Sequence, residues 1–517
     1  MTDPRPSRPI RLYHRGEIRE IRDMPATRSV LDWLREQARC TGTKEGCNEG
    51  DCGACTVVVA ELAGPGDPHA VRGLTLKAVN ACIQFLPTLD GKALFTVEDL
   101  RTMAGGALHP VQSAMVACHG SQCGFCTPGF VMSLWSAYER HRGAAQRPTR
   151  QQLADELSGN LCRCTGYRPI LEAGQQMFEW PDVALDTAPV VRSLEVLAQS
   201  EPLCYAEPHT AHHFHAPRTL EALAALRLAL PQAQLLAGGT DVGLWVTKQF
   251  KALGDVLYVG EVAALRQVQE RATELYIGAG ASLEAAWSAL AQRVPALTQV
   301  WLRFASLPIR NVGTMGGNVA NGSPIGDSAP VLMALDAQIE LRCGQRVRRM
   351  PLDAFYAGYM RNRLEPGEFV QAVAVPLSAA TRQVRAYKIS KRFDCDISAV
   401  CAGLSIELDG ELVRSVRLAF GGMAATVKRA AGAEAALLGR TWNAASVRNA
   451  QAALDQDFEP LTDMRASAAY RRQVSRNLLQ RFWLETRSVD PLPAHATSVW
   501  SGMAHAPGPR PWAGAAP

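Results

Sequence analysis

The hydrophobic positions in the first part of the chain alternate between strand-like and helix-like spacing. Residues 56–60 form a β-branched run, Thr-Val-Val-Val-Ala, which predicts a buried strand. The segment 29–39 places apolar side chains at i, i+3 and i+7, the spacing of one helix face. We therefore expect a small mixed domain of strands and helices over residues 8–92.

From residue 93 to 180 the pattern becomes helical. A threonine–proline pair at 127–128 predicts an N-cap followed by proline at the first helical position. The apolar positions after it recur at i, i+3, i+4 and i+7: Val131, Leu134, Trp135 and Tyr138. A second helix is predicted to open at Thr149, with Gln152 completing a capping box, and to end near Gly159.

Beyond residue 180 the chain has four parts. Residues 181–212 lack clear periodicity and contain four prolines, which predicts a linker. Residues 213–380 alternate strand-like and helix-like segments with glycine-rich turns, and residues 381–489 form a further α+β region. The end, 490–517, is rich in Pro, Ala and Gly, which predicts disorder. The fold class is thus an α+β multidomain chain.

Composition excludes two classes of partner. Of the 517 residues 47% are apolar and 20% are charged, as in ordinary globular proteins. The net charge of +5 comes without a basic stripe interleaved with aromatics, so we expect no nucleic acid partner. No run approaches the ~20 apolar residues that a membrane span needs. The N-terminus lacks an apolar signal segment, and with reduced cysteines this predicts a cytoplasmic location.

Eight of the fourteen cysteines fall into two quartets. The quartets are Cys47, Cys52, Cys55 and Cys82, and Cys123, Cys126, Cys162 and Cys164. The first follows the C-x4-C-x2-C spacing of plant-type ferredoxins, with a distant fourth cysteine. Its loop, residues 46–55, is glycine-rich, so it can wrap closely around a cluster and aim backbone N–H groups at its sulfurs. We predict two [2Fe–2S] clusters.

Two other uses of these cysteines have to be weighed. Disulfides persist mainly in oxidising compartments, and no secretory signal is visible. A four-cysteine zinc site remains open for the second quartet taken alone. The first quartet favours iron, because zinc ribbons pair their cysteines two by two and here three come together. Since Cys123 and Cys126 precede one predicted helix and Cys162 and Cys164 follow another, two loops at helix ends can converge on one cluster.

Two glycine-rich segments could hold a nucleotide cofactor. Segments 235–242 and 309–327 each contain Gly-Gly, which lets a backbone approach a phosphate closely and present N–H donors. Either segment alone is equally compatible with an ordinary turn. No G-x-G-x-x-G motif stands between a strand and a helix, so a Rossmann site is not supported.

Several strings of the sequence resemble one protein family, the xanthine dehydrogenases among the molybdenum hydroxylases. The similar strings are 41–55, 120–129 and 159–167 for the iron–sulfur loops, and 235–242 and 309–327 for the FAD-binding half. The similarity runs from about residue 10 to 485, and the length and domain order resemble the family's bacterial small subunit. It implies a β-grasp ferredoxin-like domain, a helical [2Fe–2S] domain, a vanillyl-alcohol-oxidase-type FAD-binding domain and an α+β flavoprotein C-terminal domain.

The resemblance also implies site residues. The first quartet matches the ligands of the ferredoxin-like domain and the second those of the helical domain. The positions that match the FAD site are Leu235, Leu236, Ala237, Gly238, Gly239, Thr240, Asp241, Val242, Phe304, Thr314, Met315, Gly316, Gly317, Asn318, Asp327, Val370 and Lys388. Tyr359 matches an aromatic near the nicotinamide side of the flavin, and Gln122 a residue that approaches the partner's pterin.

The resemblance implies an electron-transfer function and assigns no catalytic residue to this chain. A molybdenum centre oxidises hypoxanthine and xanthine to urate, and electrons pass through both clusters to FAD and then to NAD⁺. Single-chain members continue into a molybdenum domain, whereas this chain ends at Pro517, so we expect a molybdopterin-binding large subunit and an α2β2 heterotetramer. Alternatives are an aldehyde or N-heterocycle substrate, a free-standing flavin reductase, O₂ as final acceptor and a zinc-stabilised interaction scaffold.

Overall fold

The computed structural model describes residues 7–64, 67, 69–144 and 146–497. These residues divide into two compact units. The first unit comprises residues up to Ser323, Asp336–Leu377 and Ser390–Ile397, and the second Pro324–Leu335, Ser378–Ile389 and the chain from Ser398. From 498 onward the predicted disordered tail lies outside the described residues. No helix in the described ranges is long and apolar enough to cross a membrane.

The first domain is built on a five-stranded sheet in the order β2-β1-β5-β3-β4, parallel only between β1 and β5. Its elements are β1 Ile10–His14, β2 Glu17–Ile21, α1 Val30–Glu36, β3 Thr56–Leu62, β4 Leu74–Asn80 and β5 Ala93–Phe95. The predicted strand 56–60 is confirmed as the buried start of β3. The predicted helix 29–39 is confirmed as α1, where Ser29 Oγ caps the helix by accepting from Asp32 N at 3.0 Å.

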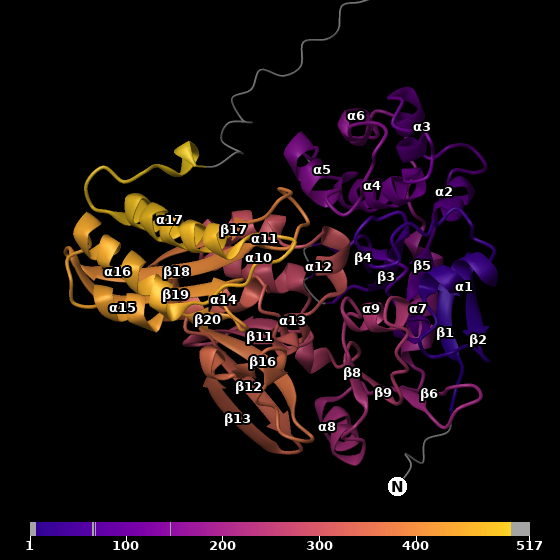
Figure 1. Cartoon of the computed structure of the whole chain (residues 1–517). Helices are drawn as coiled ribbons and strands as arrows, with labels where there is room; N and C mark the ends of the chain where they lie inside the picture. The colour runs from indigo at the N-terminus through magenta and orange to yellow at the C-terminus, as the bar shows by residue number, and fades with distance from the viewer. Residues whose placement is uncertain (1–6, 65–66, 68, 145, 498–517) are drawn as a thin grey trace, which may run out of the picture. The chain divides into compact units, whose positions relative to one another are not determined.

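The helical domain follows, with five helices: α2 Val97–Met103, α3 Pro110–Ala117, α4 Thr127–His141, α5 Arg150–Glu156 and α6 Arg168–Gln176. Figure 1 shows α3 to α6 gathered together, with α4 against β3 and β4. The capping box of Thr149 and Gln152 is confirmed, although α5 ends before Gly159. The predicted N-cap Thr127 is instead the first helical residue, and Cys126 occupies the cap position.

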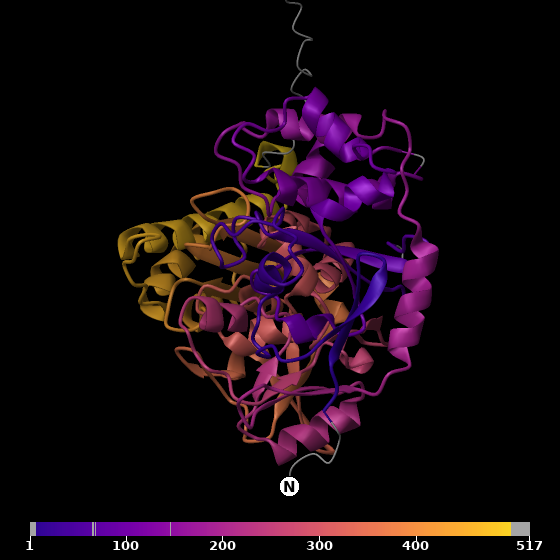
Figure 2. The same cartoon turned by 90° about the vertical axis from the view of Figure 1, so that its right-hand side faces the viewer.

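The segment predicted as a linker, 181–212, contains helix α7 Thr187–Ala198 and strand β6 Leu203–Ala206. Asp186 caps α7, whose buried side chains Val190, Leu194 and Leu197 lie on one face, and α7 contacts β1 and β3. In Figure 2 it is the magenta helix beside the strands of the first sheet. Pro189 is tolerated because it lies in the first turn, where backbone N–H groups have no intrahelical acceptor.

Two sheets form the remaining framework of the first unit. A four-stranded sheet, β6-β7-β9-β8, precedes a five-stranded antiparallel sheet, β10-β11-β16-β12-β13. The first sheet and its helices comprise β7 His213–Ala216, α8 Leu220–Ala229, β8 Gln234–Leu236, α9 Val242–Thr247 and β9 Val256–Tyr258. The later elements are β10 Val268–Glu270, β11 Glu274–Gly278, α10 Leu283–Arg293, α11 Thr298–Arg303, α12 Leu307–Val312, α13 Met315–Asn321, β12 Gln338–Cys343, β13 Arg346–Pro351, β14 Tyr356–Gly358, β15 Arg361–Asn362 and β16 Phe369–Pro376.

The second unit is an antiparallel sheet, β17-β18-β19-β20, covered by helices on both faces. Its elements are α14 Ser328–Ala334, β17 Gln383–Ile389, β18 Val400–Asp409, β19 Leu412–Gly421, β20 Lys428–Arg429, α15 Ala431–Leu437, α16 Ala444–Asp457 and α17 Ala468–Thr486. Alternate residues of β18 point to opposite faces. Ala402 and Leu404 join the core with α15, α16 and α17, whereas Gly403 and Ser405 face α14. Helix α14, predicted as part of the FAD-binding domain, therefore packs with the C-terminal domain.

Two glycines with left-handed backbone, one at the contact between the two N-terminal domains and one in open space, allow a test of how tightly these domains pack. Gly53 has a φ of +70°, and a Cβ there would lie 2.2 Å from the Gly159 carbonyl oxygen, whereas Gly16 has a φ of +89° with open space around it. We expect Gly16→Ala to lower the free energy of unfolding by about 1–2 kcal/mol, the cost of left-handed backbone. Gly53→Ala should cost more than about 4 kcal/mol. Chemical denaturation measures both, and equal losses would contradict the tight domain contact.

Candidate iron–sulfur and flavin sites

The loop between α1 and β3 brings three thiols of the first quartet together. The backbone N–H groups of Asp51 and Cys52 donate to Cys47 Sγ at 3.4 and 3.3 Å, and Cys47 N donates to Cys52 Sγ at 3.3 Å. A Cβ on Gly46 would lie 2.7 Å from Cys52 Sγ, so the loop closes tightly only with glycine there. The predicted N–H donors to sulfur are thus confirmed. The hydrogen bond from Cys52 also lowers the pKa of Cys47 to about 5, which favours the thiolate that iron binds.

Each quartet is arranged as two thiol pairs. Cys55 and Cys82, both buried, share a hydrogen bond that, with burial, raises the pKa of Cys82. In the second quartet Cys126 pairs with Cys162, and Cys123 pairs with Cys164. Among the described residues no group of three or more His, Cys, Asp or Glu side chains is placed to hold a single metal ion. A [2Fe–2S] cluster instead spreads four thiolates over two irons, and the paired arrangement fits it.

The second quartet is more exposed than the first. Cys123 and Cys126 precede α4, and Cys162 and Cys164 lie between α5 and α6, so two helix ends converge as predicted. Cys123 and Cys164 are exposed, whereas Cys55 and Cys82 of the first quartet are buried. Cys162 Sγ lies 3.2 Å from the hydroxyl of Thr165, within hydrogen-bond distance. One end of the second site therefore faces the outside.

The two ligand loops touch each other directly. The N–H of Leu161 donates to the carbonyl of Cys52 at 3.0 Å, which joins a ligand of the first quartet to the residue before Cys162. The buried Asn160 side chain donates to the Gly53 carbonyl at 3.1 Å and accepts from Ser133 Oγ at 2.6 Å. The two ligand segments are thus linked by a backbone hydrogen bond from Leu161 and a side-chain hydrogen bond from Asn160.

The two glycine turns predicted as a flavin site also come together. The first connects β8 to α9 and the second begins α13. A Cβ on Gly238 would lie 1.8 Å from the Val312 carbonyl oxygen, and one on Gly313 would lie 3.4 Å from Thr240 Oγ1. Thr314 Oγ1 caps α13 by accepting from Gly317 N at 3.1 Å. Closely apposed backbone of this kind is a cradle that a dinucleotide phosphate fits.

The first ligand loop lies against this flavin turn. Gln84 Nε2 donates to the Gly238 carbonyl at 2.9 Å, and Gln84 is two residues after the ligand Cys82. A Cβ on Gly239 or Gly243 would lie 2.8 or 2.9 Å from the Ile83 carbonyl oxygen. The segment directly after the ligand Cys82 and the glycine turn are therefore in contact within the first unit.

Two predicted flavin residues belong to the second unit, where they form a buried polar triad with a third. Lys388 Nζ donates to Asp327 Oδ2 at 2.6 Å and to Ser398 Oγ at 2.9 Å, and Ser398 Oγ donates to Asp327 Oδ1 at 2.6 Å. All three side chains are buried. Charged groups persist in an interior only when paired and hydrogen-bonded, so the triad is a fixed polar cluster within the second unit.

The other predicted positions differ in setting. Phe304 is buried, with its ring 5.8 Å from that of Trp287, and Val370 is a buried residue of β16. Tyr359 is 66% exposed, and Gln122 is exposed beside Cys123. The proposed roles of these four positions at the flavin or the pterin stay predictions.

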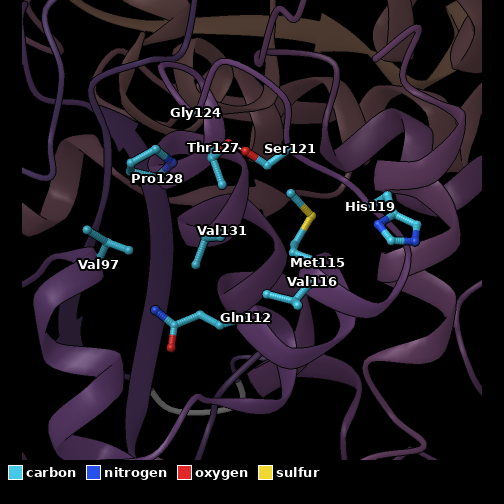
Figure 3. Close-up of a pocket in the computed structure, with 10 residues that line it drawn as sticks. All are labelled: Val97, Gln112, Met115, Val116, His119, Ser121, Gly124, Thr127, Pro128 and Val131. Carbon is cyan, nitrogen blue, oxygen red and sulfur yellow. Dashed lines mark hydrogen bonds between the residues drawn. The ribbon is translucent and has the colours of Figure 1, made fainter. Parts of the chain in front are cut away.

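A cavity of about 510 Å³ opens beside the second quartet. Figure 3 shows its lining, with a 2.7 Å hydrogen bond between the hydroxyls of Ser121 and Thr127. The lining residues are Val97, Gln112, Met115, Val116, His119, Ser121, Gly124, Thr127, Pro128 and Val131. The cavity is mostly apolar, and its rim belongs to the loop that carries Cys123 and Cys126.

Sequence reasoning missed the residues that join these sites. Asn160, Gln84 and Ser398 each make a side-chain hydrogen bond between segments distant in the chain. Only Asn160 had a sequence signal, because it lies in the string 159–167 next to the ligands. The other two stand in no motif.

Comparison with known proteins identifies four domains. The sequence matches the family models described as "2Fe-2S iron-sulfur cluster binding domain" over 12–85 and "[2Fe-2S] binding domain" over 96–175. It also matches "FAD binding domain in molybdopterin dehydrogenase" over 209–378 and "CO dehydrogenase flavoprotein C-terminal domain" over 385–486. These matches confirm the predicted fold class, with two [2Fe–2S]-binding domains and one FAD-binding domain.

Similar proteins include large oxidoreductases. Xanthine dehydrogenase of Drosophila subobscura is 34% identical over 77% of this chain and 33% of its own length. Aldehyde oxidase 4 of Cavia porcellus is 30% identical over 89% of this chain and 38% of its own. A chain of reconstituted CO dehydrogenase from Oligotropha carboxidovorans aligns with a TM-score of 0.50 at 25% identity, covering 53% of this chain and 96% of that one. This chain spans about a third of the length of the curated relatives it matches.

Proposed function

We propose that this chain is part of a molybdenum hydroxylase and serves a xanthine dehydrogenase; its two [2Fe–2S] domains and its FAD-binding domain support this. In this proposal it carries electrons from a molybdenum centre outside these residues to FAD and on to NAD⁺, while hypoxanthine and xanthine are oxidised to urate. The molybdenum centre belongs to a molybdopterin-binding large subunit, and two copies of each chain form an α2β2 heterotetramer.

One observation carries the proposal: a continuous series of contacts within the first unit. The Leu161 N–H bonds the Cys52 carbonyl, and Gln84 beyond Cys82 bonds the Gly238 carbonyl. The cysteines of the helical domain, those of the ferredoxin-like domain and the flavin turn thus follow in order. When bound, the clusters would supply single-electron transfer. The flavin would accept two electrons one at a time and pass them on together as a hydride.

The exposure of the two quartets supports the proposed direction of electron transfer. Electrons arrive at Cys123 and Cys164, which are exposed, and the partner docks over them and over the apolar cavity at their rim. The first quartet has no exposed thiol: Cys55 and Cys82 are buried, and Cys47 and Cys52 are half-buried. We therefore place it further from the partner than the second quartet.

The relatives support two substrate classes. The similarity to xanthine dehydrogenases favours a purine, and the similarity to aldehyde oxidases keeps an aldehyde as the second candidate. The solved CO dehydrogenase chain covers only 53% of this one, whereas this chain joins clusters and flavin in one polypeptide, as xanthine dehydrogenases do. We therefore place the purine first.

The test uses the chain purified with its natural partner. We expect the complex to reduce NAD⁺ when supplied with xanthine, followed as absorbance of NADH, and to use an aromatic aldehyde at least about tenfold less efficiently by kcat/KM, which is about 1.4 kcal/mol of transition-state discrimination. Reduction of O₂ without NAD⁺ reduction would contradict the proposed acceptor. A preference for the aldehyde would replace the substrate and leave the electron-transfer function in place.

A further inference from the structure

Lys248, at the end of α9, touches the first ligand loop. Its Nζ donates to the carbonyl oxygen of Cys47 at 2.5 Å and lies 3.9 Å from the Glu49 carboxylate. Helix α9 starts directly after the glycine turn at 238–239. The FAD-binding domain therefore places an ammonium group on the loop that supplies three of the four thiols of the other domain.

Packing on both sides fixes this position. The Lys248 N–H bonds the Leu244 carbonyl, so the residue continues the helical turn. At the other end of α9, a Cβ on Gly243 would lie 3.0 Å from the Cβ of Ile83, which allows no side chain between the helix and the segment after Cys82. The helix is thus held against both parts of the first quartet.

We infer that Lys248 sets the reduction potential of the ferredoxin-like cluster and raises it. One-electron reduction adds a negative charge to the cluster without forming or breaking a bond, and a nearby cation stabilises that charge. The inference rests on the proposed assignment of this cluster to Cys47, Cys52, Cys55 and Cys82. A raised potential makes this cluster the better acceptor for electrons from the helical-domain cluster.

The other charged residues of the loop do not supply the positive charge that Lys248 places beside Cys47. Glu49 carries the opposite charge 3.9 Å from Lys248 Nζ, so it reduces the effect of Lys248, whose ammonium is the group that bonds the Cys47 carbonyl at 2.5 Å. Asp51 is paired with Arg392 at 3.5 Å, and those two charges offset each other. Lys44 donates to the Thr41 carbonyl, outside the ligand span.

The experiment is a redox titration of the purified chain, with both clusters followed by EPR. We expect Lys248→Met to lower the potential of the ferredoxin-like cluster, so that its ratio of reduced to oxidised form at a fixed potential falls about three- to tenfold. Tenfold corresponds to about 59 mV for one electron. Glu49→Gln should shift the same cluster upward, and Lys248→Arg should leave it near wild type.

Two internal controls make the result decisive. The helical-domain cluster should keep its potential in every variant. Lys251→Met removes the same charge nearby, where Lys251 Nζ lies 5.2 Å from the Trp245 ring centroid, and should leave both clusters unchanged. An unshifted ferredoxin-like cluster in Lys248→Met, or shifts of one sign in both Lys248→Met and Glu49→Gln, would overturn the inference. A wild-type chain with no such cluster would overturn the proposed function as well.

Discussion

Replacing Cys52 with serine removes the EPR signal of one [2Fe–2S] cluster and leaves the other in place. Serine cannot replace the soft thiolate that iron prefers, and Cys52 is hydrogen-bonded to Cys47 inside the closed ligand loop. We expect iron to fall from about four to about two atoms per chain, since each cluster holds two. EPR of the dithionite-reduced protein, with iron analysis, measures both quantities.

The reciprocal variant and a matched control separate ligand loss from damage. Cys126→Ser should remove the other signal and spare the first, because Cys126 pairs with Cys162 in the helical domain. Cys40→Ala changes a fully buried thiol of the first domain that lies 3.7 Å from His14 Nε2 and belongs to neither quartet, so both signals should remain. Two intact signals in Cys52→Ser would show that the ligand set is wrong.

Replacing Asp327 with alanine should lower the FAD content of the purified protein by about tenfold or more. The carboxylate accepts hydrogen bonds from Lys388 and Ser398 in a buried triad of the second unit, and the family resemblance matches Asp327 and Lys388 to FAD-binding positions. Loss of a charged hydrogen-bonding group costs about 1.5–3 kcal/mol, and 1.4 kcal/mol is a factor of ten in binding. The ratio of flavin to protein absorbance gives the result.

Folding has to be separated from flavin binding, because Asp327→Ala also leaves the buried Lys388 ammonium without its partner. Asp327→Asn keeps the size and the hydrogen bond to Ser398, so it should fold better and still lose flavin. The [2Fe–2S] EPR signals, which belong to the first unit, report whether that unit is intact. Full flavin retention in Asp327→Asn with normal cluster signals would show that this triad does not bind FAD.

Much of the local structure was predictable because it depends on neighbours in the chain. The spacing of Cys47, Cys52 and Cys55 and the capping box at Thr149 act within a few residues, and the structure places both as expected. Helix α7 is not predicted because the four prolines of residues 181–212 indicate a linker, although Pro189, the one within α7, lies in a first turn that tolerates proline. Local sequence patterns therefore predict helical periodicity and caps well. They exclude helices too readily where a proline occurs, because a first turn tolerates it.

The contacts between sites could not be predicted, because they join distant residues of ordinary type. Gln84 and Gly238 are 154 positions apart, and Asp327 and Ser398 are 71 apart. Their pairing depends on how whole domains pack, which no local pattern encodes. The same holds for Lys248, which no local pattern distinguishes from the chain's seven other lysines until the fold brings it to Cys47.

The number of electrons that the chain takes up most directly tests whether it holds two [2Fe–2S] clusters and FAD. The account predicts that an anaerobic reductive titration of the purified chain, followed by visible absorbance and EPR, takes up about four electrons per chain: one for each [2Fe–2S] cluster and two for FAD. The EPR spectrum should resolve two clusters at full reduction. Uptake of about two electrons without an iron–sulfur signal, or stoichiometric zinc in place of iron, would contradict it.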